Sequence, residues 1–367
     1  FRLCEDINYS CDNADKLLDV STWGNQEWRY ARSMFKGASQ LNFTAIDTPD
    51  LSKVTSMRSM FTGTTSFNSN ITNWDVSNVT DMSFMFAGAD SFNQPLNNWD
   101  MSSVVNTSWM FNGADTFNQP LNNWDVSNVI SMRAMFVGAD AFNQPLNNWD
   151  VSSVTDMGAM FVRADAFNQP LNNWDVSNVT NMGSMFSPTE SFNQPLNNWD
   201  VSSVTDMGGM FVNADAFNQP LNNWDVSNVV SMERMFFAAD VFNQPLNNWN
   251  VSSVTSMFRM FSATSVFNQP LDNWDVSNVA DMGEMFKESE FNQPLGNWDT
   301  SSVTMMRELF EDCPYNHPLN DWDVSNVTNM ESMFRFNPYN HPLDNWNTGN
   351  VINMDRMFAY SSFNQSI

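Results

Sequence analysis

Apolar positions along this chain follow a pattern that returns about every 25 residues. In the copy that runs from Leu96 to Val104, apolar side chains stand at relative positions 1, 4, 6 and 9. The centre of this stretch, Trp-Asp-Val-Ser in most copies, alternates between apolar and polar residues, which is typical of a short half-buried strand. A second phrase, Met-x-x-Met-Phe, spaces its apolar residues at i, i+3 and i+4, which is typical of one face of a short helix. Each copy is therefore predicted to form a strand, a short helix and an extended return.

The tryptophans define the register of the copies. They recur 25 residues apart from Trp74 to Trp274 and 24 residues apart from there to Trp346. The lost residue falls between Phe286 and Phe291, where a loop tolerates a change of length. One copy cannot bury its apolar face alone, so the copies must stack and place like residues side by side. We therefore predict a leucine-rich-repeat-like solenoid, a right-handed coil with short parallel strands on one face and short helices on the other.

The copies also suggest where the array begins. Residues 1–40 keep only traces of the pattern and are predicted to form a degenerate N-terminal cap. Residues 41–367 are predicted to form about 13 further units of 24–26 residues, of which the last is incomplete. Position 1 is not methionine, which favours a removed signal peptide or numbering that covers part of a longer protein. The final phrase breaks off, which favours a truncated chain, a further domain or a cap supplied by another molecule.

Charge excludes some classes of partner. The formal net charge is −26, from 41 acidic and 15 basic residues. A surface this negative repels nucleic acid and favours cations or basic partners. No run of 18 apolar residues exists, so no membrane span is predicted.

Cysteine and histidine are rare in this chain. Cys4 and Cys11 would form a disulfide in an oxidising compartment, with two buried free thiols as the alternative. Cys313 is expected to be a small core residue. His317 and His341 stand in two successive copies of Tyr-Asn-His-Pro-Leu, so they would either share a transition metal or simply replace glutamine at a turn.

The polar residues of the predicted strand form the candidate binding face. Its members are Asn98, Asp100, Ser102, Asn123, Asp125, Asp150, Asp175, Asp200, Asp225 and Asp275. Like charges about 5 Å apart repel by roughly 1 kcal/mol, so a cation, a basic partner or hydrogen bonds must offset the repulsion. Calcium suits such oxygen ligands, but the glycine-rich calcium nonapeptide of β-helices is absent. Hydrogen-bonded turn residues are therefore favoured, and no cofactor is predicted. Repetition gives every carboxylate a similar environment, which argues against catalysis.

Asparagine sequons also recur along the chain. If the source glycosylates its secreted proteins, solvent-facing sequons are expected to carry glycans. The candidates are Asn8, Asn42, Asn70, Asn78, Asn106, Asn178, Asn250 and Asn326.

The combined phrase Trp-Asp-Val-Ser-Asn-Val-Thr-x-Met-x-x-Met-Phe, followed by Phe-Asn-Gln-Pro-Leu, resembles a repeat of about 26 residues in bacterial surface proteins, the DUF285 type. That repeat is related to BspA-like leucine-rich repeats. The resemblance covers about residues 54–367, with departures at Asn250 and Asn347, which replace the usual aspartate, and at Leu309, which replaces methionine. It implies a leucine-rich-repeat-like solenoid at a cell surface or secreted, with no catalytic residues and with adhesion as the usual role.

Two functions follow from these observations. The first is a non-enzymatic extracellular or cell-surface structural or adhesive solenoid, whose acidic Asn/Asp/Ser surface binds protein or glycan multivalently or assembles end to end. The alternative is a receptor-like module that binds one defined ligand on its concave sheet. That alternative needs side chains that vary between copies, and those of the predicted strand barely do.

Overall fold

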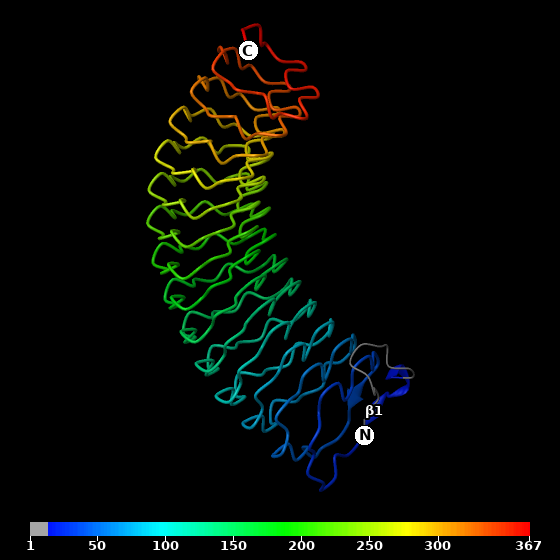
Figure 1. The fold of residues 1–367 in the computed structure, drawn as a ribbon. Helices are drawn as coiled ribbons and strands as arrows, with labels where there is room; N and C mark the ends of the chain where they lie inside the picture. The colour runs from blue at the N-terminus through cyan, green and yellow to red at the C-terminus, as the bar shows by residue number, and fades with distance from the viewer. Residues whose placement is uncertain (1–13) are drawn as a thin grey trace. The chain divides into compact units, whose positions relative to one another are not determined.

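A computed structural model describes residues 14–367 of the chain. The chain divides into two compact units. Unit 1 comprises Phe1–Val179 with Thr189–Gln194, and unit 2 comprises Thr180–Pro188 with Pro195–Ile367. Each unit is a stack of coils in which one sequence repeat makes one coil (Figure 1). Each unit is therefore a repeat solenoid, as predicted.

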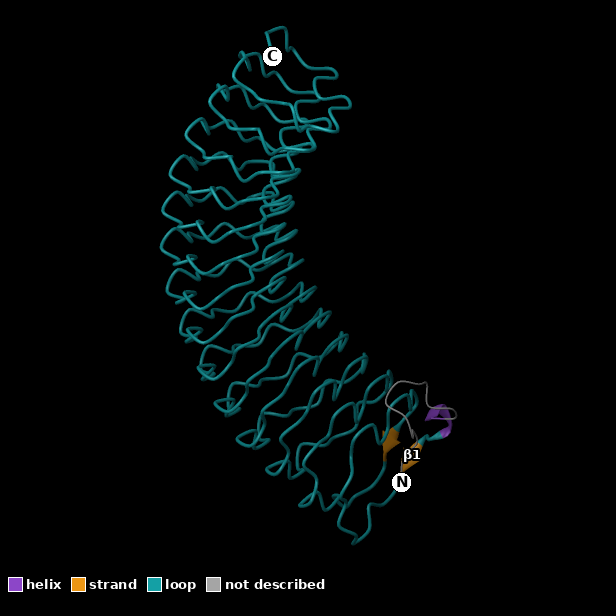
Figure 2. Ribbon diagram, viewed as in Figure 1, coloured by secondary structure: helices purple, strands orange, loops and turns teal. Residues whose placement is uncertain are grey.

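Regular secondary structure is almost absent from the described residues (Figure 2). A 3-10 helix, η1, spans Ala14–Lys16, and two short strands, β1 (Asp19–Val20) and β2 (Asn42–Phe43), pair in parallel. The coils themselves consist of turns that are joined by isolated parallel bridges. The predicted strand and helix in every copy are therefore wrong, although the predicted stacking of the copies is right.

The Met-x-x-Met-Phe segment forms successive turns instead of a helix. The Met85 amide donates to the Met82 carbonyl at 3.1 Å, three residues back, and the turn repeats at Ala87. Phe84 lies between them with a positive φ of 58°, which ends any right-handed helix. Amides of this segment donate to the next coil, as Phe84 does to the Ser108 carbonyl at 2.9 Å. The turns thus bury the residues at i, i+3 and i+4 as a helix would. The backbone amides of the segment meanwhile form a ladder of hydrogen bonds from one coil to the next.

The Trp-Asp-Val-Ser segment is also built of turns. The Trp124 amide donates to the Leu121 carbonyl at 3.1 Å, and the Val129 amide donates to the Val126 carbonyl at 2.9 Å. Between these turns the Ser127 amide donates to Oδ1 of Asp125 at 3.1 Å. The aspartate side chain takes the N–H group that a neighbouring strand would need, so no strand ladder forms here.

Files of identical apolar side chains fill the interior of each unit. Phe86 and Phe111 stack at 5.6 Å between ring centroids, and Trp124 and Trp149 stack at 6.2 Å. These side chains are at most 3% exposed. Tryptophans of this file also donate a hydrogen bond to the preceding coil. For example, Nε1 of Trp149 donates to the Leu121 carbonyl at 2.9 Å. The core is therefore shared between neighbouring coils, because a single coil has too little apolar surface of its own.

A ladder of asparagine side chains lies beside this core. Oδ1 of Asn93 accepts from the Asn118 amide and from Nε2 of Gln119, both at 3.0 Å. The bond survives the shortening of the repeat, because the Asn292 amide still donates to Oδ1 of Asn268 at 2.9 Å. The ladder therefore satisfies polar backbone groups between coils, and the lost residue is absorbed in the preceding loop.

Candidate binding face

The aspartates of the predicted binding face each bond within their own coil. Oδ1 of Asp100 accepts the Ser102 amide at 3.0 Å and the Ser102 hydroxyl at 2.6 Å. Asn250, which stands at the aspartate position of its copy, makes the same two bonds to Ser252. This is the hydrogen-bonded turn that we expected as the alternative to a metal site. The amide of Asn123 donates to Asn97 Oδ1 at 3.0 Å, so the neighbouring asparagines join adjacent coils.

These bonds stabilise the ionised carboxylate. Hydrogen bonds first from the serine hydroxyl and then from the serine amide lower the pKa of Asp100, and also of Asp150, Asp200 and Asp275. Among residues 14–367, no three His, Cys, Asp or Glu side chains gather in a group that could hold a metal ion. Calcium binding by the aligned aspartates was the disfavoured alternative in the sequence analysis, and it remains untested.

The two histidines take over the role of glutamine in the polar ladder. Nε2 of His317 lies 3.1 Å from the Asn292 carbonyl, and Nε2 of His341 lies 3.1 Å from the Asn316 carbonyl. A carbonyl only accepts, so Nε2 carries the proton in both rings. Gln244 Nε2 makes the equivalent bond to the Asn218 carbonyl at 3.2 Å. The turn interpretation is therefore supported over a shared metal.

Of the three cysteines, only Cys313 lies among the described residues. Cys313 is a free thiol and buried, and burial raises its pKa to about 12, so it stays protonated. Cys4, Cys11 and Asn8 lie outside the described residues. Asn106 is half-buried, and the remaining predicted sequon asparagines are exposed: Asn42, Asn70, Asn78, Asn178, Asn250 and Asn326. Glycosylation at these positions stays a prediction.

Sequence variation gathers elsewhere, on the segment that carries the coil-to-coil ladder. We call the two positions after the first Met of Met-x-x-Met-Phe, and the two positions after its Phe, the variable face. Successive coils place Arg58-Ser59, Ser83-Phe84, Ser108-Trp109 and Arg133-Ala134 at the first two of these positions. Comparing the copies column by column would have found this face. The sequence-based prediction missed this face because it placed the binding residues on the predicted strand.

Basic residues also belong to the variable face. From Val54 onward every lysine and arginine stands at one of its four positions, whereas the phrases from Phe-Asn-Gln-Pro-Leu to Trp-Asp-Val-Ser carry acids and no base. These basic residues are Arg58, Arg133, Arg163, Arg234, Arg259, Lys287, Arg307, Arg335 and Arg356. Each coil thus has a constant acidic part and a variable part of mixed charge.

In unit 1 the variable face carries a stack of aromatic rings. Phe84 and Trp109 lie parallel with their centroids 5.8 Å apart, and the Arg58 guanidinium lies 4.9 Å from the centre of the Phe84 ring. Arg58 Nη1 also donates to Ser83 Oγ at 3.0 Å. Phe84 and Trp109 both have positive φ, a conformation that costs a bulky residue about 1–2 kcal/mol. Large rings are thus held at a position that the backbone would fill more easily with glycine.

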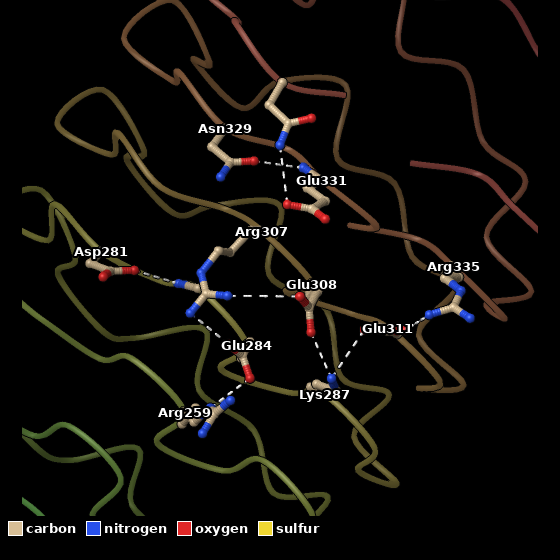
Figure 3. Close-up of polar contacts among 12 residues, drawn as sticks. Arg259, Asp281, Glu284, Lys287, Arg307, Glu308, Glu311, Asn329, Glu331 and Arg335 are labelled. Carbon is tan, nitrogen blue, oxygen red and sulfur yellow. Dashed lines mark hydrogen bonds and ion pairs between the residues drawn. The ribbon is translucent and has the colours of Figure 1, made fainter. Parts of the chain in front are cut away.

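In unit 2 the variable face carries a network of ion pairs (Figure 3). Glu284 is 1% exposed and accepts from Arg259 Nε at 2.6 Å and lies 2.7 Å from Arg307 Nη2. Lys287 Nζ lies 2.6 Å from Glu308 Oε2 and 3.3 Å from Glu311 Oε2. The network links successive coils, and a buried carboxylate such as that of Glu284 is tolerated only because it is paired.

A glycine, which has no side chain, lets contacts of this network extend across a coil. Arg259, Arg307 and Arg234 lie 5.1, 5.2 and 5.8 Å from the centre of the Phe258 ring. Arg307 belongs to the second coil after that of Phe258, and the coil between them has Gly283 in this column. A Cβ atom on Gly283 would lie 3.4 Å from both Phe258 and Arg307 and 3.0 Å from Asp281 Oδ1. The glycine therefore makes room for the ring and the guanidinium to meet.

Comparison with known proteins places the chain in a family. The model of the family described as "Mycoplasma protein of unknown function, DUF285" matches residues 29–147, 120–217, 191–290 and 284–367. These matches run through nearly the whole chain, so the chain belongs to the DUF285 family, as its repeats predicted. No curated protein matches it.

A solved structure was also found. It is a crystal structure of an internalin (inlF) from Listeria monocytogenes, with 7% sequence identity and a TM-score of 0.26, covering 97% of this chain and 88% of that one. So low a score carries no argument about this fold, and the leucine-rich-repeat likeness remains a resemblance of sequence. Among residues 14–367, no helix has the length and apolar character that crossing a bilayer requires.

Proposed function

We propose that this chain is a non-enzymatic binding module of a secreted or surface-displayed protein, and that it recognises a macromolecular partner through the variable face. The observation that carries the proposal is the concentration of sequence variation at that face, together with the confinement of basic residues to it from Val54 onward. In a repeat protein the core residues must stay constant so that the coils stack, whereas residues that read a partner are free to differ. Arginine and aromatic side chains, which this face holds, are also the ones that contribute most at protein interfaces.

The proposal is tested by binding of the labelled chain to arrays of extracellular-matrix proteins and glycans and to intact cells. A variable-face variant combines four substitutions, each to a residue that the same column holds in another coil: Trp109→Ala, Arg133→Ser, Arg234→Ser and Phe258→Ser. Because other coils accept these residues, the variant is expected to fold. Binding that disappears in this variant supports the proposal.

A matched control changes the constant face instead. Asp125, Asp150, Asp175 and Asp225 become asparagine, which Asn250 shows to be compatible with both turn hydrogen bonds. This variant is expected to bind as the parent chain does. Binding that survives the variable-face substitutions and fails in the asparagine variant would contradict the proposal.

The second candidate function is multivalent display of the constant Asn/Asp/Ser surface. It is favoured by the uniform turns, which present one aspartate in almost every coil. A basic protein is the partner that this surface suits, and the asparagine variant is its direct test. End-to-end self-association belongs to the same hypothesis, and a strictly monomeric species in sedimentation at high concentration would rule it out.

A further inference from the structure

The variable face of unit 1 carries basic residues and no acid. From Val54 to Arg163 its charged members are Arg58, Arg133 and Arg163, and its other positions hold Ser, Thr, Asn, Gly, Ala, Val, Phe and Trp. The variable face of unit 2 differs, because most of its bases pair with acids of the same face, as Lys287 does with Glu308. A chain of net charge −26 thus has one strip whose only charges are positive.

The three arginines of this strip are available to a partner. Arg163 is exposed, and among residues 14–367 neither Arg163 nor Arg58 has an acid within ion-pair distance. The side chain of Arg133 is 47% exposed and lies 3.7 Å from Asp156, an acid outside the variable face. An exposed pair at that distance stabilises little, so Arg133 can exchange it for another carboxylate. The strip therefore suits an acidic partner.

The aspartate column of the constant face offers matching carboxylates. Asp100, Asp125 and Asp150 are exposed, and each accepts from its serine through Oδ1. Within the described part of the chain their Oδ2 atoms accept no hydrogen bond. Guanidinium and carboxylate groups form charge-assisted hydrogen bonds, which are stronger than neutral ones. One chain therefore carries both halves of an ionic contact, on different segments of its coils.

The spacing of these residues favours a second copy of the chain over an unrelated acid. Arg58 and Arg133 stand in the same column, 75 residues and three coils apart. Asp100 and Asp175 are also 75 residues and three coils apart, and each coil between them has its own aspartate. Because the same stacking of coils sets both intervals, arginines of one copy that meet aspartates of another stay in register with them.

We propose that copies of this chain associate side by side, with the arginines of the unit 1 variable face bound to the aspartate column of the next copy. The two surfaces differ, so every pair leaves one of each free and further copies can add. The net charge of −26 opposes association at long range. At about 0.15 M salt, however, charges more than about 8 Å apart are largely screened, so the pairs in contact decide. This inference rests on the proposed function, because it names the partner of the variable face in unit 1.

Sedimentation velocity of the full chain tests the inference. At about 0.15 M salt the mean mass should rise with concentration beyond that of a dimer, and at about 1 M salt, where the screening length is about 3 Å, it should return to that of a monomer. The arginine variant combines Arg58→Ser, Arg133→Ser and Arg163→Asn, which are residues that the same columns hold in other coils. It should therefore fold, and it should stay monomeric.

The aspartate variant replaces the whole column with asparagine, which Asn250 shows to keep the turn. The substituted positions are Asp75, Asp100, Asp125, Asp150, Asp175, Asp200, Asp225, Asp275, Asp299 and Asp323. The net charge changes from −26 to −16 because ten carboxylates are lost, so general repulsion falls, yet this variant should also be monomeric. Mixed in equal amounts, the two variants should form one-to-one dimers that do not grow, because each keeps one working surface.

Three results would overturn the inference: the parent chain is monomeric at every concentration, association persists in either variant, or the mixed variants stay apart. In each case the proposed function still stands if a partner from the arrays binds the parent and not the four-residue variable-face variant. If that variant binds every partner as the parent does, the proposed function fails as well.

Discussion

Replacing Trp124 with phenylalanine removes one defined link between two coils. Nε1 of Trp124 donates to the Leu96 carbonyl of the preceding coil at 2.9 Å, and the side chain is 3% exposed. Phenylalanine keeps an aromatic ring in the file, but it has no N–H group and fills less volume.

The expected cost has two parts. The lost hydrogen bond contributes about 0.5–1.5 kcal/mol, at the modest end of such losses because the Leu96 carbonyl keeps its bond from the Trp99 amide at 3.0 Å. The smaller ring leaves space in a close-packed file, which costs a further 1–2 kcal/mol or so. We therefore expect a loss of about 2–3 kcal/mol in the free energy of unfolding.

Urea unfolding followed by far-ultraviolet circular dichroism measures this loss through the midpoint at constant slope. Trp149→Phe should cost the same within about 0.5 kcal/mol, because its bond to the Leu121 carbonyl is also 2.9 Å and the residue is equally buried. Trp109→Phe is the control and should change stability by less than about 0.5 kcal/mol. The reasoning is refuted if Trp124→Phe matches the parent, or if the two ladder variants differ by more than about 1 kcal/mol.

Three further predictions concern charge and the polar ladder. Glu284→Ala leaves Arg259 and Arg307 without their shared carboxylate and should lower the free energy of unfolding in urea by about 3–5 kcal/mol. Glu288 is exposed, so Glu288→Ala should lower it little. Equal losses in the two variants would contradict the role of burial. Asn143→Ala removes the acceptor of the Asn168 amide and of Gln169 Nε2 and should cost about 1–3 kcal/mol; a neutral result would show that water replaces the ladder. Hydrogen bonds from serine lower the pKa of Asp100, Asp150 and Asp200 in the folded chain, so their stabilisation is present above the unfolded pKa of about 3.9 and is lost as the pH falls through the folded pKa. The thermal midpoint should therefore fall more steeply below about pH 4 in the parent than in a variant with asparagine at Asp100, Asp150 and Asp200, and parallel curves would contradict this assignment.

Burial was predictable from the sequence, whereas the local backbone was not. The spacing of Met82, Met85 and Phe86 placed all three in the core, and each is fully buried. The same spacing arises from a helix and from a run of turns, so periodicity alone does not separate them. The deciding feature is the positive φ at Phe84, which phenylalanine rarely adopts and which residue type therefore does not reveal.

The position of the candidate site was missed for the same reason. The parallel backbone hydrogen bonds between copies were predicted along Trp-Asp-Val-Ser, but in that segment the Asp125 side chain accepts a hydrogen bond from the Ser127 amide. The ladder forms instead along Met-x-x-Met-Phe, and the variable residues accompany it there. The predicted stacking of like residues was correct because the near-identical copies define their register without knowledge of the backbone.

The joints between coils within each unit are nearly interchangeable. In the Met-x-x-Met-Phe segment the amides donate toward the following coil, as Met82 does to Asn106 and Met282 does to Met305, both at 3.0 Å. A coil removed whole, or added whole in the same orientation, would meet neighbours with the same donors and acceptors. Gene duplication and recombination could therefore lengthen or shorten such an array without redesigning its interior, and each new copy would bring a fresh set of outward side chains on which selection could act.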